Sequence, residues 1–481
     1  MSGSVRNFER DFVGAMDPFR VALIERSRSG RRRLWDFATL RRHAAAYAGA
    51  LAREGVRPGD VVMTLIGNRP EWVITMLACF RMGAVALPSN EQLTPRDLAG
   101  RLRRVPVAAI VADERNASVI HEAAPGCSAL WISDPGLVHA PAAAHVDLSD
   151  DDPAIMIFTS GTSGEPKCAV HGQRYLWGQE LQATAWVDAR PGEVSWCTAA
   201  SGWSKSARNA FIAPWMTGAT ALLHDERFDV DQRLELIEEE NVNVLCMAPT
   251  EYRALIKRGA PRPSASLRST ISAGEPLDAG VLSAWAECMG LDIRDGYGQT
   301  ETGQLAAVGP NDEPRPGSMG KPLPGVKLWT EDGELVADPA TIPTFFLGYY
   351  GEPMHPSPWH TADRVRADDD GYLYFEARTD DVIISAGYRI GPVEVEAALL
   401  QHPAVAEAAC TSYPDEERGA IVRAMIVLTP GATASERLVI DIQNHVRSVT
   451  APYKYPRRID FVENLPRTAS GKIERAALKD L

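Results

Sequence analysis

Thr159-Ser160-Gly161-Thr162-Ser163-Gly164-Glu165-Pro166-Lys167 is a loop rich in glycine and hydroxyl groups, and it follows an apolar run over residues 154–158. An apolar run of this length predicts a buried strand. Glycines let backbone N–H groups turn toward a bound anion, and the lysine adds a mobile positive charge. The order of the glycines and the lysine does not fit the Walker A pattern. The stretch therefore predicts a polyphosphate-binding loop, and a flexible surface loop is the alternative.

Alternating helix and strand patterns surround this loop and predict an α/β fold with doubly wound parallel sheets covered by helices. Apolar strand patterns occupy residues 61–66, 84–88, 107–112, 194–197, 219–223, 242–247 and 267–272, and helix patterns occupy 41–53, 71–82 and 232–240. Thr250 is expected to cap a further helix. Ligands of such sheets bind at the carboxyl ends of the strands, so the turns at 273–276 and 295–298 predict one shared nucleotide crevice.

The character of the chain changes from about residue 309, where prolines and glycines become frequent. We expect an antiparallel β-rich subdomain over about 309–379, with a turn-rich segment over 359–381. The last hundred residues predict a small α+β domain with a helix over 392–401 and strands over 422–428 and 458–462. Residues 441–481 carry eight Lys/Arg and five Asp/Glu, a local excess that suggests an anionic ligand.

Charge and cysteine content narrow the class of protein. The 481-residue chain has a net charge of −13, which argues against a general nucleic-acid binder and against binding to anionic membranes. Its seven cysteines form no C-x-x-C pair, so a disulfide framework or a zinc site is not expected. The N-terminal residues have no apolar core, and no run of about 18 apolar residues occurs. These features predict a cytoplasmic protein without a membrane anchor.

Six segments, taken in order, resemble the signature of the adenylate-forming (ANL) superfamily and its acyl-CoA synthetases. The medium-chain acyl-CoA synthetase branch is the most similar, because residues 248–250, 387–392 and 449–457 match its pattern as well. The six segments are 159–167, Asp295-Gly296-Tyr297-Gly298-Gln299-Thr300-Glu301, Trp359-His360-Thr361-Ala362-Asp363, 378–383, 385–390 and Arg467-Thr468-Ala469-Ser470-Gly471-Lys472.

The resemblance implies an ATP- and Mg²⁺-dependent acid–CoA ligase that activates a carboxylic acid as an acyl adenylate and transfers the acyl group to CoA. It also implies a large AMP-binding domain over 1–379 and a small mobile C-terminal lid domain over 380–481, with the hinge at Asp380. Two alternatives remain open. One is an adenylate-forming ligase with a carrier protein or amine as acceptor, or with an oxyacid such as nitrite as substrate; the other is a nucleotide-binding pseudoenzyme. The oligomeric state, monomer or homodimer, is left undecided.

By the same resemblance, Lys472, Thr300 and Glu301 are the catalytic residues, and Glu301 also binds the metal ion. Asp363 would accept hydrogen bonds from the ribose hydroxyls, since an ionised carboxylate only accepts. Tyr297 would stack on adenine, with a core aromatic as the alternative reading. The implied ATP-binding residues are Thr159, Ser160, Gly161, Thr162, Ser163, Gly164, Lys167, Gly274, Glu275, Pro276, Asp295, Gly296, Tyr297, Gly298, Gln299, Asp363, Arg378 and Arg389.

Residues of the C-terminal segment match the CoA-binding positions of the medium-chain branch. Arginine forks suit the phosphates of the CoA nucleotide, although ordinary surface charge is the alternative. The implied CoA-binding residues are Ala386, Gly387, Tyr388, Arg418, Arg447, Tyr455 and Arg457.

Departures from the family pattern occur at Ala362, Ala377 and Ile384. An alanine at 362 would shift the turn if its φ is positive, because a Cβ is disfavoured there. The resemblance places the acyl pocket near Trp203, Lys205 and Ala207, in a polar stretch that also contains Arg208. Lys205 or Arg208 facing this pocket would suit a short or aryl acid with an extra polar or anionic group. The alternative is that both side chains face solvent.

Overall fold

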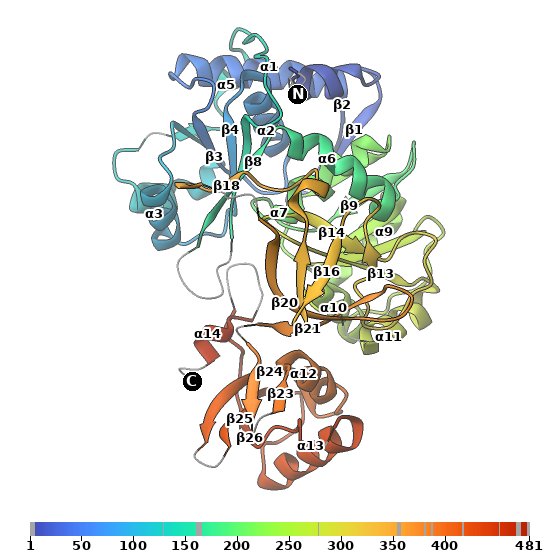
Figure 1. Cartoon of the computed structure of the whole chain (residues 1–481). Helices are drawn as coiled ribbons and strands as arrows, with labels where there is room; N and C mark the ends of the chain where they lie inside the picture. Colours follow the sequence, from blue (N-terminus) through green and yellow to red (C-terminus); the bar gives the residue numbers. More distant parts are fainter. Residues whose placement is uncertain are drawn as a thin grey trace.

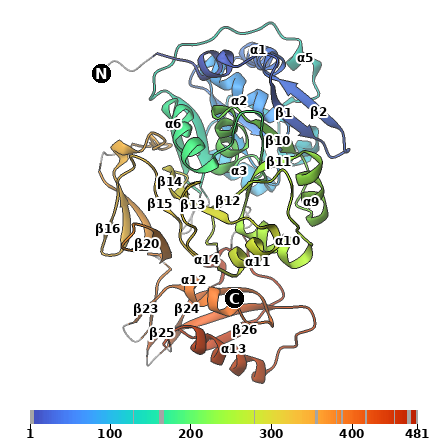
Figure 2. The same ribbon diagram turned by 90° about the vertical axis from the view of Figure 1, so that its right-hand side faces the viewer.

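The computed structural model describes residues 5–127, 129–159, 166–277, 279–353, 357–379, 381–385, 388–415, 418–451, 453–467 and 473–478. Two large sheets with their helices form the upper part of the molecule in Figure 1, and a small domain of residues beyond 380 lies below them. Figure 2 shows the same division from the side. The expected α/β architecture is therefore confirmed. In the described ranges, no helix has the length and apolar character needed to cross a membrane.

The first large sheet carries the glycine-rich loop at one of its hairpins. Its strand order is β19-β18-β8-β7-β4-β3-β5-β6. The five strands β7, β4, β3, β5 and β6 are parallel, as the alternating pattern predicts. The strands are β3 (Val61–Leu65), β4 (Val85–Ser89), β5 (Ala109–Ala112), β6 (Ala129–Trp131), β7 (Pro153–Phe158), β8 (Cys168–Gly172), β18 (Gly348–Tyr349) and β19 (Glu352–Pro353).

The second large sheet has the order β15-β14-β13-β12-β11-β9-β10-β1-β2. Six neighbouring strands from β13 to β1 are parallel, so their carboxyl ends point toward the same edge. The strands are β1 (Val21–Arg26), β2 (Arg32–Asp36), β9 (Val194–Cys197), β10 (Thr220–His224), β11 (Val242–Met247), β12 (Ser269–Ala273), β13 (Ile293–Gln299), β14 (Gly303–Ala307) and β15 (Lys321–Pro322).

Strands from the proline-rich segment join three different sheets. β15 extends the second large sheet, and β18 and β19 extend the first. The others form an antiparallel sheet of β16 (Leu328–Glu331), β17 (Glu334–Ala337), β20 (Trp359–Ala367) and β21 (Leu373–Arg378). The expectation of a turn-rich segment over 359–381 was wrong, because two long strands with alternating burial occupy most of it.

The small domain contains the α+β pattern expected for the C-terminal residues. Its three-stranded sheet has β25 between an antiparallel β24 and a parallel β26. An apolar core of its own joins α12, α13 and these strands. Its elements are β22 (Ile383–Ser385), β23 (Tyr388–Ile390), α12 (Pro392–Leu400), β24 (Val405–Asp415), β25 (Gly419–Leu428), α13 (Glu436–Val449), β26 (Arg458–Phe461) and α14 (Arg475–Leu478).

Helices cover both large sheets, and their main apolar cluster joins the two. Five fully buried tryptophans, at 72, 186, 196, 215 and 285, fill much of this interior. The helices are α1 (Phe37–Arg53), α2 (Pro70–Met82), α3 (Pro95–Arg104), α4 (Ala117–Ala123), α5 (Pro135–Val138), α6 (Arg174–Gln182), α7 (Ser204–Ala207), α8 (Ala213–Met216), α9 (Val230–Glu239), α10 (Pro249–Arg258) and α11 (Ala279–Met289).

Two helix details bear on the site. The expected N-cap at Thr250 was wrong: α10 begins at Pro249 with Ala248 as its cap. Proline fits the first helical position because its missing N–H is not needed there. Two π-helical turns, η4 (Ala183–Val187) and η5 (Arg208–Ile212), continue α6 and α7. Such turns are rare and occur frequently at functional sites.

Candidate functional site

The glycine-rich loop joins two antiparallel strands, β7 and β8, and so closes a hairpin. At its base the Thr159 N–H donates to the Lys167 carbonyl oxygen at 2.8 Å. The hairpin therefore fixes where the loop starts and ends, beside β18 of the same sheet. Five of the predicted phosphate ligands lie outside the described residues, which resume at Pro166: Ser160, Gly161, Thr162, Ser163 and Gly164.

Tyr349 in β18 connects the end of this loop with the predicted metal ligand. Its hydroxyl donates to Oε1 of Glu301 at 2.7 Å. The Lys167 ammonium lies 4.6 Å from the centre of the Tyr349 ring and 3.1 Å from Oε2 of Glu352. Thr300 and Glu301 themselves lie in the turn between β13 and β14. Tyr349 thus contacts Lys167 with its ring and Glu301 with its hydroxyl, although these two residues are more than a hundred positions apart in the sequence.

Asp363 in β20 lies at the centre of a buried hydrogen-bond network. Arg378 in β21 donates from Nη1 to its Oδ1 at 2.9 Å. Gln299 donates from Nε2 to Oδ2 at 2.8 Å, and the Tyr297 hydroxyl also donates to Oδ2. Only 4% of Asp363 is exposed. Three predicted ATP-binding residues from two different sheets therefore converge on the carboxylate of a fourth.

Burial and the neighbouring hydrogen-bond donors have opposite effects on the pKa of the Asp363 carboxylate. Desolvation raises the pKa of Asp363 above its ordinary value, while Arg378, Tyr297 and Gln299 each lower it. The Tyr297 pKa is raised well above its ordinary range by burial and by the neighbouring Asp363. The phenol therefore keeps its proton and remains a donor to the carboxylate.

Ala362 has the positive φ that was considered for this position, and this conformation is strained for a residue with a Cβ. Its φ is +55°, in the left-handed region that favours glycine. The turn is held by the Ala362 N–H, which donates to Oε1 of Glu334 at 2.8 Å, and by the Ala362 carbonyl, which accepts from the Thr379 N–H at 2.8 Å. The surrounding hydrogen bonds therefore fix a backbone position next to Asp363 against a local steric preference.

Replacing Ala362 with glycine is expected to raise the free energy of unfolding by about 1 kcal/mol, because glycine adopts positive φ without the Cβ strain. Thermal unfolding of the variant and of the wild type at one pH measures the difference. Ala377→Gly is the matched control: Ala377 pairs with Arg364 on the neighbouring strand and has no positive φ, so this variant should lose stability. An Ala362→Gly variant that unfolds at a lower temperature than the wild type would contradict the strain argument.

The predicted adenine wall lies at the carboxyl ends of β12 and β13. Glu275 accepts a hydrogen bond from the Thr250 hydroxyl at 2.7 Å, and Gly274 and Pro276 beside it are exposed. Asp295 accepts from the Gly296 N–H at 2.9 Å. Burial raises the pKa of Asp295 to about 8, and the nearby Lys205 ammonium lowers it less strongly. At neutral pH this side chain is therefore mostly a neutral acid.

The three residues predicted for the acyl pocket lie along one short segment but face different surroundings. Trp203 caps α7 and is half-buried. Lys205 donates from Nζ to the Ala273 carbonyl at 2.9 Å, so it lies beside the predicted adenine wall. Ala207 is buried, as is Arg208 at the start of η5. The alternative in which both Lys205 and Arg208 face solvent is wrong.

Part of the predicted CoA site comes together on the small domain. The Arg447 guanidinium lies 3.8 Å from the centre of the Tyr455 ring, and Arg457 donates from Nη1 to the Tyr455 hydroxyl at 2.7 Å. Tyr388 stacks on Tyr453 with ring centres 4.3 Å apart. Arg418 lies in the turn between β24 and β25, where its N–H donates to Asp415.

Several predictions concern residues for which the structure gives no position or no side chain. Arg389 belongs to β23, where it pairs with Ile384, and only its backbone is described. The predicted hinge, two CoA-binding residues and the catalytic lysine lie outside the described residues: Asp380, Ala386, Gly387 and Lys472.

Sequence reasoning missed the residues that position the predicted ligands. Tyr349 supports Glu301, and Glu334 supports the Ala362 turn. Trp359 donates from Nε1 to Oε1 of Gln299 at 2.9 Å and so orients the amide that binds Asp363. A tyrosine or tryptophan in a short β-rich segment carries no signal of such a role, because the partner lies on another sheet.

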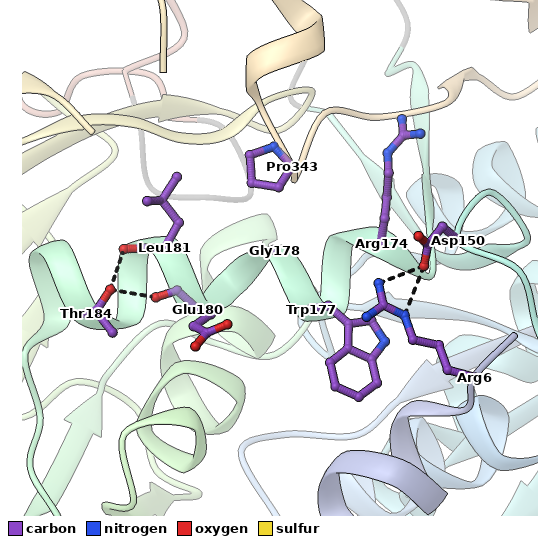
Figure 3. A pocket seen from close by; sticks show the side chains of 9 residues that line it. All are labelled: Arg6, Asp150, Arg174, Trp177, Gly178, Glu180, Leu181, Thr184 and Pro343. Atoms are coloured by element: carbon purple, nitrogen blue, oxygen red, sulfur yellow. Dashed lines mark hydrogen bonds and ion pairs between the residues drawn. The ribbon is translucent and has the colours of Figure 1, made fainter. Parts of the chain in front are cut away.

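An open groove of about 600 Å³ lies away from this network, over the outward face of α6. Figure 3 shows its lining, with Trp177 and the Arg6–Asp150 ion pair at one end and Pro343 above the helix. Of the predicted site residues that the structure describes, none lines this groove. The α6 surface on this side is therefore separate from the hydrogen-bond network around Asp363.

Comparisons with known proteins agree with this arrangement. The family model described as "AMP-binding enzyme" matches residues 12–341, and "AMP-binding enzyme C-terminal domain" matches residues 394–472. The "Uncharacterized acyl--CoA ligase YtcI" of Bacillus subtilis is 37% identical, covering 98% of this chain and 95% of that protein. The mitochondrial "Acyl-coenzyme A synthetase ACSM4" of Rattus norvegicus is 36% identical, covering 93% and 84%.

A solved structure shares the fold over almost the whole chain. The anthranilate CoA ligase AuaEII, in complex with anthranoyl-AMP, superimposes with a TM-score of 0.89 at 27% identity, covering 98% of this chain and 96% of that one. Tyr297 and Gln299 of the described network lie within residues 12–341, and Asp363 and Arg378 lie between the two ranges matched by the family models. The chain therefore belongs to the AMP-binding enzyme family, among its acyl-CoA synthetases.

Proposed function

We propose that this acid–CoA ligase uses the residues around Asp363 and Glu301 to form an acyl adenylate from ATP and a carboxylic acid, and then transfers the acyl group to CoA. The observation that carries the assignment of the nucleotide site is the buried Asp363 carboxylate, which is fixed by three donors from two sheets.

The pattern of donors on Asp363 suits a diol such as the ribose of ATP. Each carboxylate oxygen accepts about two hydrogen bonds. Within the described residues Oδ1 accepts one bond, from Arg378, so a ribose hydroxyl can occupy its second position. The other hydroxyl is proposed to replace the Tyr297 phenol on Oδ2, which frees the Tyr297 ring to stack on adenine.

In the first half-reaction, a carboxylate oxygen of the acid attacks the α-phosphorus of ATP and the bond to pyrophosphate breaks. Negative charge then has to be neutralised on both the phosphates and the acid. We assign this task to Thr300 and the Thr159–Lys167 loop, and by family resemblance to Lys472 and Arg389, while Glu301 would contribute only through the metal ion that it holds. Mg²⁺, held through Glu301, would supply positive charge against the phosphate oxygens, and one carboxylate plus substrate phosphates is a usual magnesium site.

In the second half-reaction, the CoA sulfur attacks the acyl carbonyl carbon and AMP leaves with the electron pair of the broken bond. The Arg447–Tyr455–Arg457 cluster supports a CoA-nucleotide site on the small domain. Two guanidinium groups are already positioned there by one phenol ring, and arginine forks suit phosphate groups. Tyr388, Arg418, Ala386 and Gly387 are proposed to contribute to the same path.

We further propose domain limits of 1–379 and 380–481, with Asp380 as the hinge of a mobile lid. Hinges are a few residues that absorb a large change in φ and ψ. In the described state, Lys257 of α10 donates to the Ala406 carbonyl of the small domain at 3.1 Å. A contact through a flexible lysine side chain breaks easily, which favours a lid that can separate. The scattered cysteines support a reducing compartment such as the cytosol.

An ATP–pyrophosphate exchange assay with a broad panel of acids, followed by detection of CoA thioesters, tests the proposal. The expected result is exchange that requires both Mg²⁺ and an acid, and thioester formation when CoA is added. Exchange without any thioester formation would indicate that the acyl acceptor is a molecule other than CoA. An absence of exchange with every acid would contradict the proposed nucleotide and metal roles.

Replacing Tyr349 with phenylalanine is expected to raise the Mg²⁺ concentration for half-maximal activity about tenfold, because groups that orient a metal ligand typically contribute a factor of about 10 to 100. The substitution removes the 2.7 Å hydrogen bond to Glu301 and keeps the ring that faces Lys167. Mg²⁺ titrations of the exchange rate measure the effect. Tyr350→Phe is the control, since Tyr350 is exposed. An unchanged Mg²⁺ dependence of the Tyr349→Phe variant would show that the Tyr349 hydroxyl does not contribute to metal binding.

A further inference from the structure

A group of buried polar side chains lies next to Gly296 in β13 and next to Thr300 in the turn that follows this strand. It is formed by residues of β8, α6, η5 and β14, and its members are His171, Gln179, Gln182, Arg208, Asn209 and Gln304, each at most 4% exposed. Gln182 donates from Nε2 to Oδ1 of Asn209 at 3.1 Å, which links α6 to η5. So many polar groups are unusual in a core, because burial without partners is costly.

Helix α6 has two opposite faces, and this polar group belongs to the inward one. Figure 3 shows the outward face, with Arg174, Trp177 and Leu181 along the open groove. Tyr175, Gln179 and Gln182 follow the inward spacing of three and four residues and are buried. An ordinary amphipathic helix would place apolar side chains at these positions. The two glutamines therefore call for polar partners inside the molecule.

Many polar atoms of this group have no hydrogen-bond partner among the described residues. They include Nε and Nη1 of Arg208, Nδ2 of Asn209, and the side-chain oxygens of Gln182 and Gln304. Buried polar atoms in native proteins almost always have partners, so such a concentration indicates a polar ligand or ordered water. Arg208 and Asn209 belong to the π-helical turn η5, and Gln182 directly precedes the π-helical turn η4.

Arg208 determines the chemistry of that ligand. Its guanidinium has five N–H donors and no acceptor. Where the structure describes the chain, no carboxylate comes within 4.0 Å of this guanidinium, and the residue is only 4% exposed. A buried cation without a counter-charge is strongly disfavoured. A carboxylate, which accepts hydrogen bonds on both of its oxygens, suits a guanidinium whose Nε and Nη1 are both without partners.

The polar group adjoins the proposed reaction site. A Cβ at Gly296 would approach Gln304 Nε2 to 2.2 Å, so this amide packs directly against the backbone of β13 at Gly296. The ring centre of His171 lies 4.1 Å from that of Tyr175. Burial and the nearby Arg208 lower the pKa of His171 to about 3, while the Thr300 and Thr344 backbones act in the opposite direction. The neutral His171 ring is therefore close to both Arg208 and the backbone of the proposed catalytic Thr300.

We propose that the acid substrate carries a second anionic group, a carboxylate at the end remote from the reacting carboxyl, and that Arg208 binds this group with help from Asn209. The inference rests on the proposed function, because it assigns the far end of the acyl pocket of the same site. It also accounts for a buried cation that has no counter-charge among the residues that the structure describes. The reacting carboxyl then lies near Thr300 and the remote carboxylate near η5.

ATP–pyrophosphate exchange with matched acid pairs tests this inference. The pairs are hexanoate with adipate and 4-methylbenzoate with terephthalate, which differ in a methyl or carboxylate at the remote end. We expect the wild type to prefer the dicarboxylate of at least one pair by about 30-fold in kcat/KM. Arg208→Met is expected to abolish that preference by lowering kcat/KM for the dicarboxylate about 30-fold, with less than about a threefold change for its partner. Arg208→Lys should retain part of the preference.

Arg190→Met is the matched control, because the Arg190 side chain is 64% exposed. It should leave both members of each pair unchanged. Arg208→Met should also unfold at the same or a higher temperature, since an apolar side chain of similar volume removes an uncompensated buried charge. Exchange with monocarboxylates only, or an equal loss for both members of a pair in Arg208→Met, would overturn the inference and leave the proposed function intact. No exchange with any acid would overturn both.

Discussion

Replacing Asp363 with asparagine is expected to lower kcat/KM for ATP roughly 1000-fold. Hydrogen bonds to a charged group contribute about 1.5–3 kcal/mol each, and the proposed ribose contact contains two. The amide would also place an N–H₂ group on one side of the former carboxylate, where it faces either Arg378 at the Oδ1 position or Gln299 and Tyr297 at the Oδ2 position, and all three residues are donors. The loss therefore combines the missing acceptor with a new clash between donors. Steady-state exchange rates at varied ATP concentration measure it.

ATP analogues that lack a ribose hydroxyl show whether Asp363→Asn acts by losing the contact with the ribose or by disturbing the structure in general. The wild type is expected to discriminate strongly against 2′-deoxy-ATP and 3′-deoxy-ATP, whereas Asp363→Asn should discriminate much less, because its contact to both hydroxyls is already lost. Asp369→Asn, on the exposed turn of the same hairpin, is the matched control. If Asp363→Asn kept the full wild-type discrimination, the ribose-binding role would have to be given to another residue.

Replacing Asp295 with asparagine is expected to stabilise the protein increasingly as the pH rises. Burial raises the pKa of Asp295 from 3.8 to about 8. Between these two values the unfolded chain releases the proton and the folded chain retains it, so the wild type loses stability with rising pH. This loss is about 3 kcal/mol between about pH 5 and pH 7.5, and asparagine removes it. The amide oxygen can still accept from the Gly296 N–H.

Urea unfolding at about pH 5 and pH 7.5 measures this effect as the difference in free energy between Asp295→Asn and the wild type. The difference should grow by about 3 kcal/mol over the interval. Asp292→Asn, just before the same strand and exposed, should change the free energy of unfolding by no more than about 0.5 kcal/mol at either pH. An Asp295→Asn difference that stays constant with pH would show that Asp295 ionises normally in the folded protein.

The sequence carried most of the fold because its local signals agree with the tertiary structure. Apolar runs such as 242–247 became parallel strands, since a strand buried on both faces needs a continuous apolar pattern. The hairpin of β20 and β21 was missed. Its Asp368-Asp369-Asp370-Gly371 turn and its polar outward residues hide an alternation in burial that only the neighbouring strands create. The cap of α10 was misplaced by two residues because proline at the first helical position was overlooked.

The sequence by itself indicated which residue types the proposed nucleotide site contains, because the motifs at 295–301 and 359–363 are local in the chain. Only the tertiary structure decided how they are held. Tyr349 is hydrogen-bonded to Glu301, Glu334 to Ala362, and Trp359 to Gln299. In each pair the two residues are far apart in the sequence. The same holds for the buried guanidinium of Arg208, whose Nε and Nη1 have no hydrogen-bond partner in the part of the chain that the structure describes. The sequence shows that an arginine is present, but only the packing decides whether its guanidinium is solvated, paired with a carboxylate, or buried where a ligand can bind.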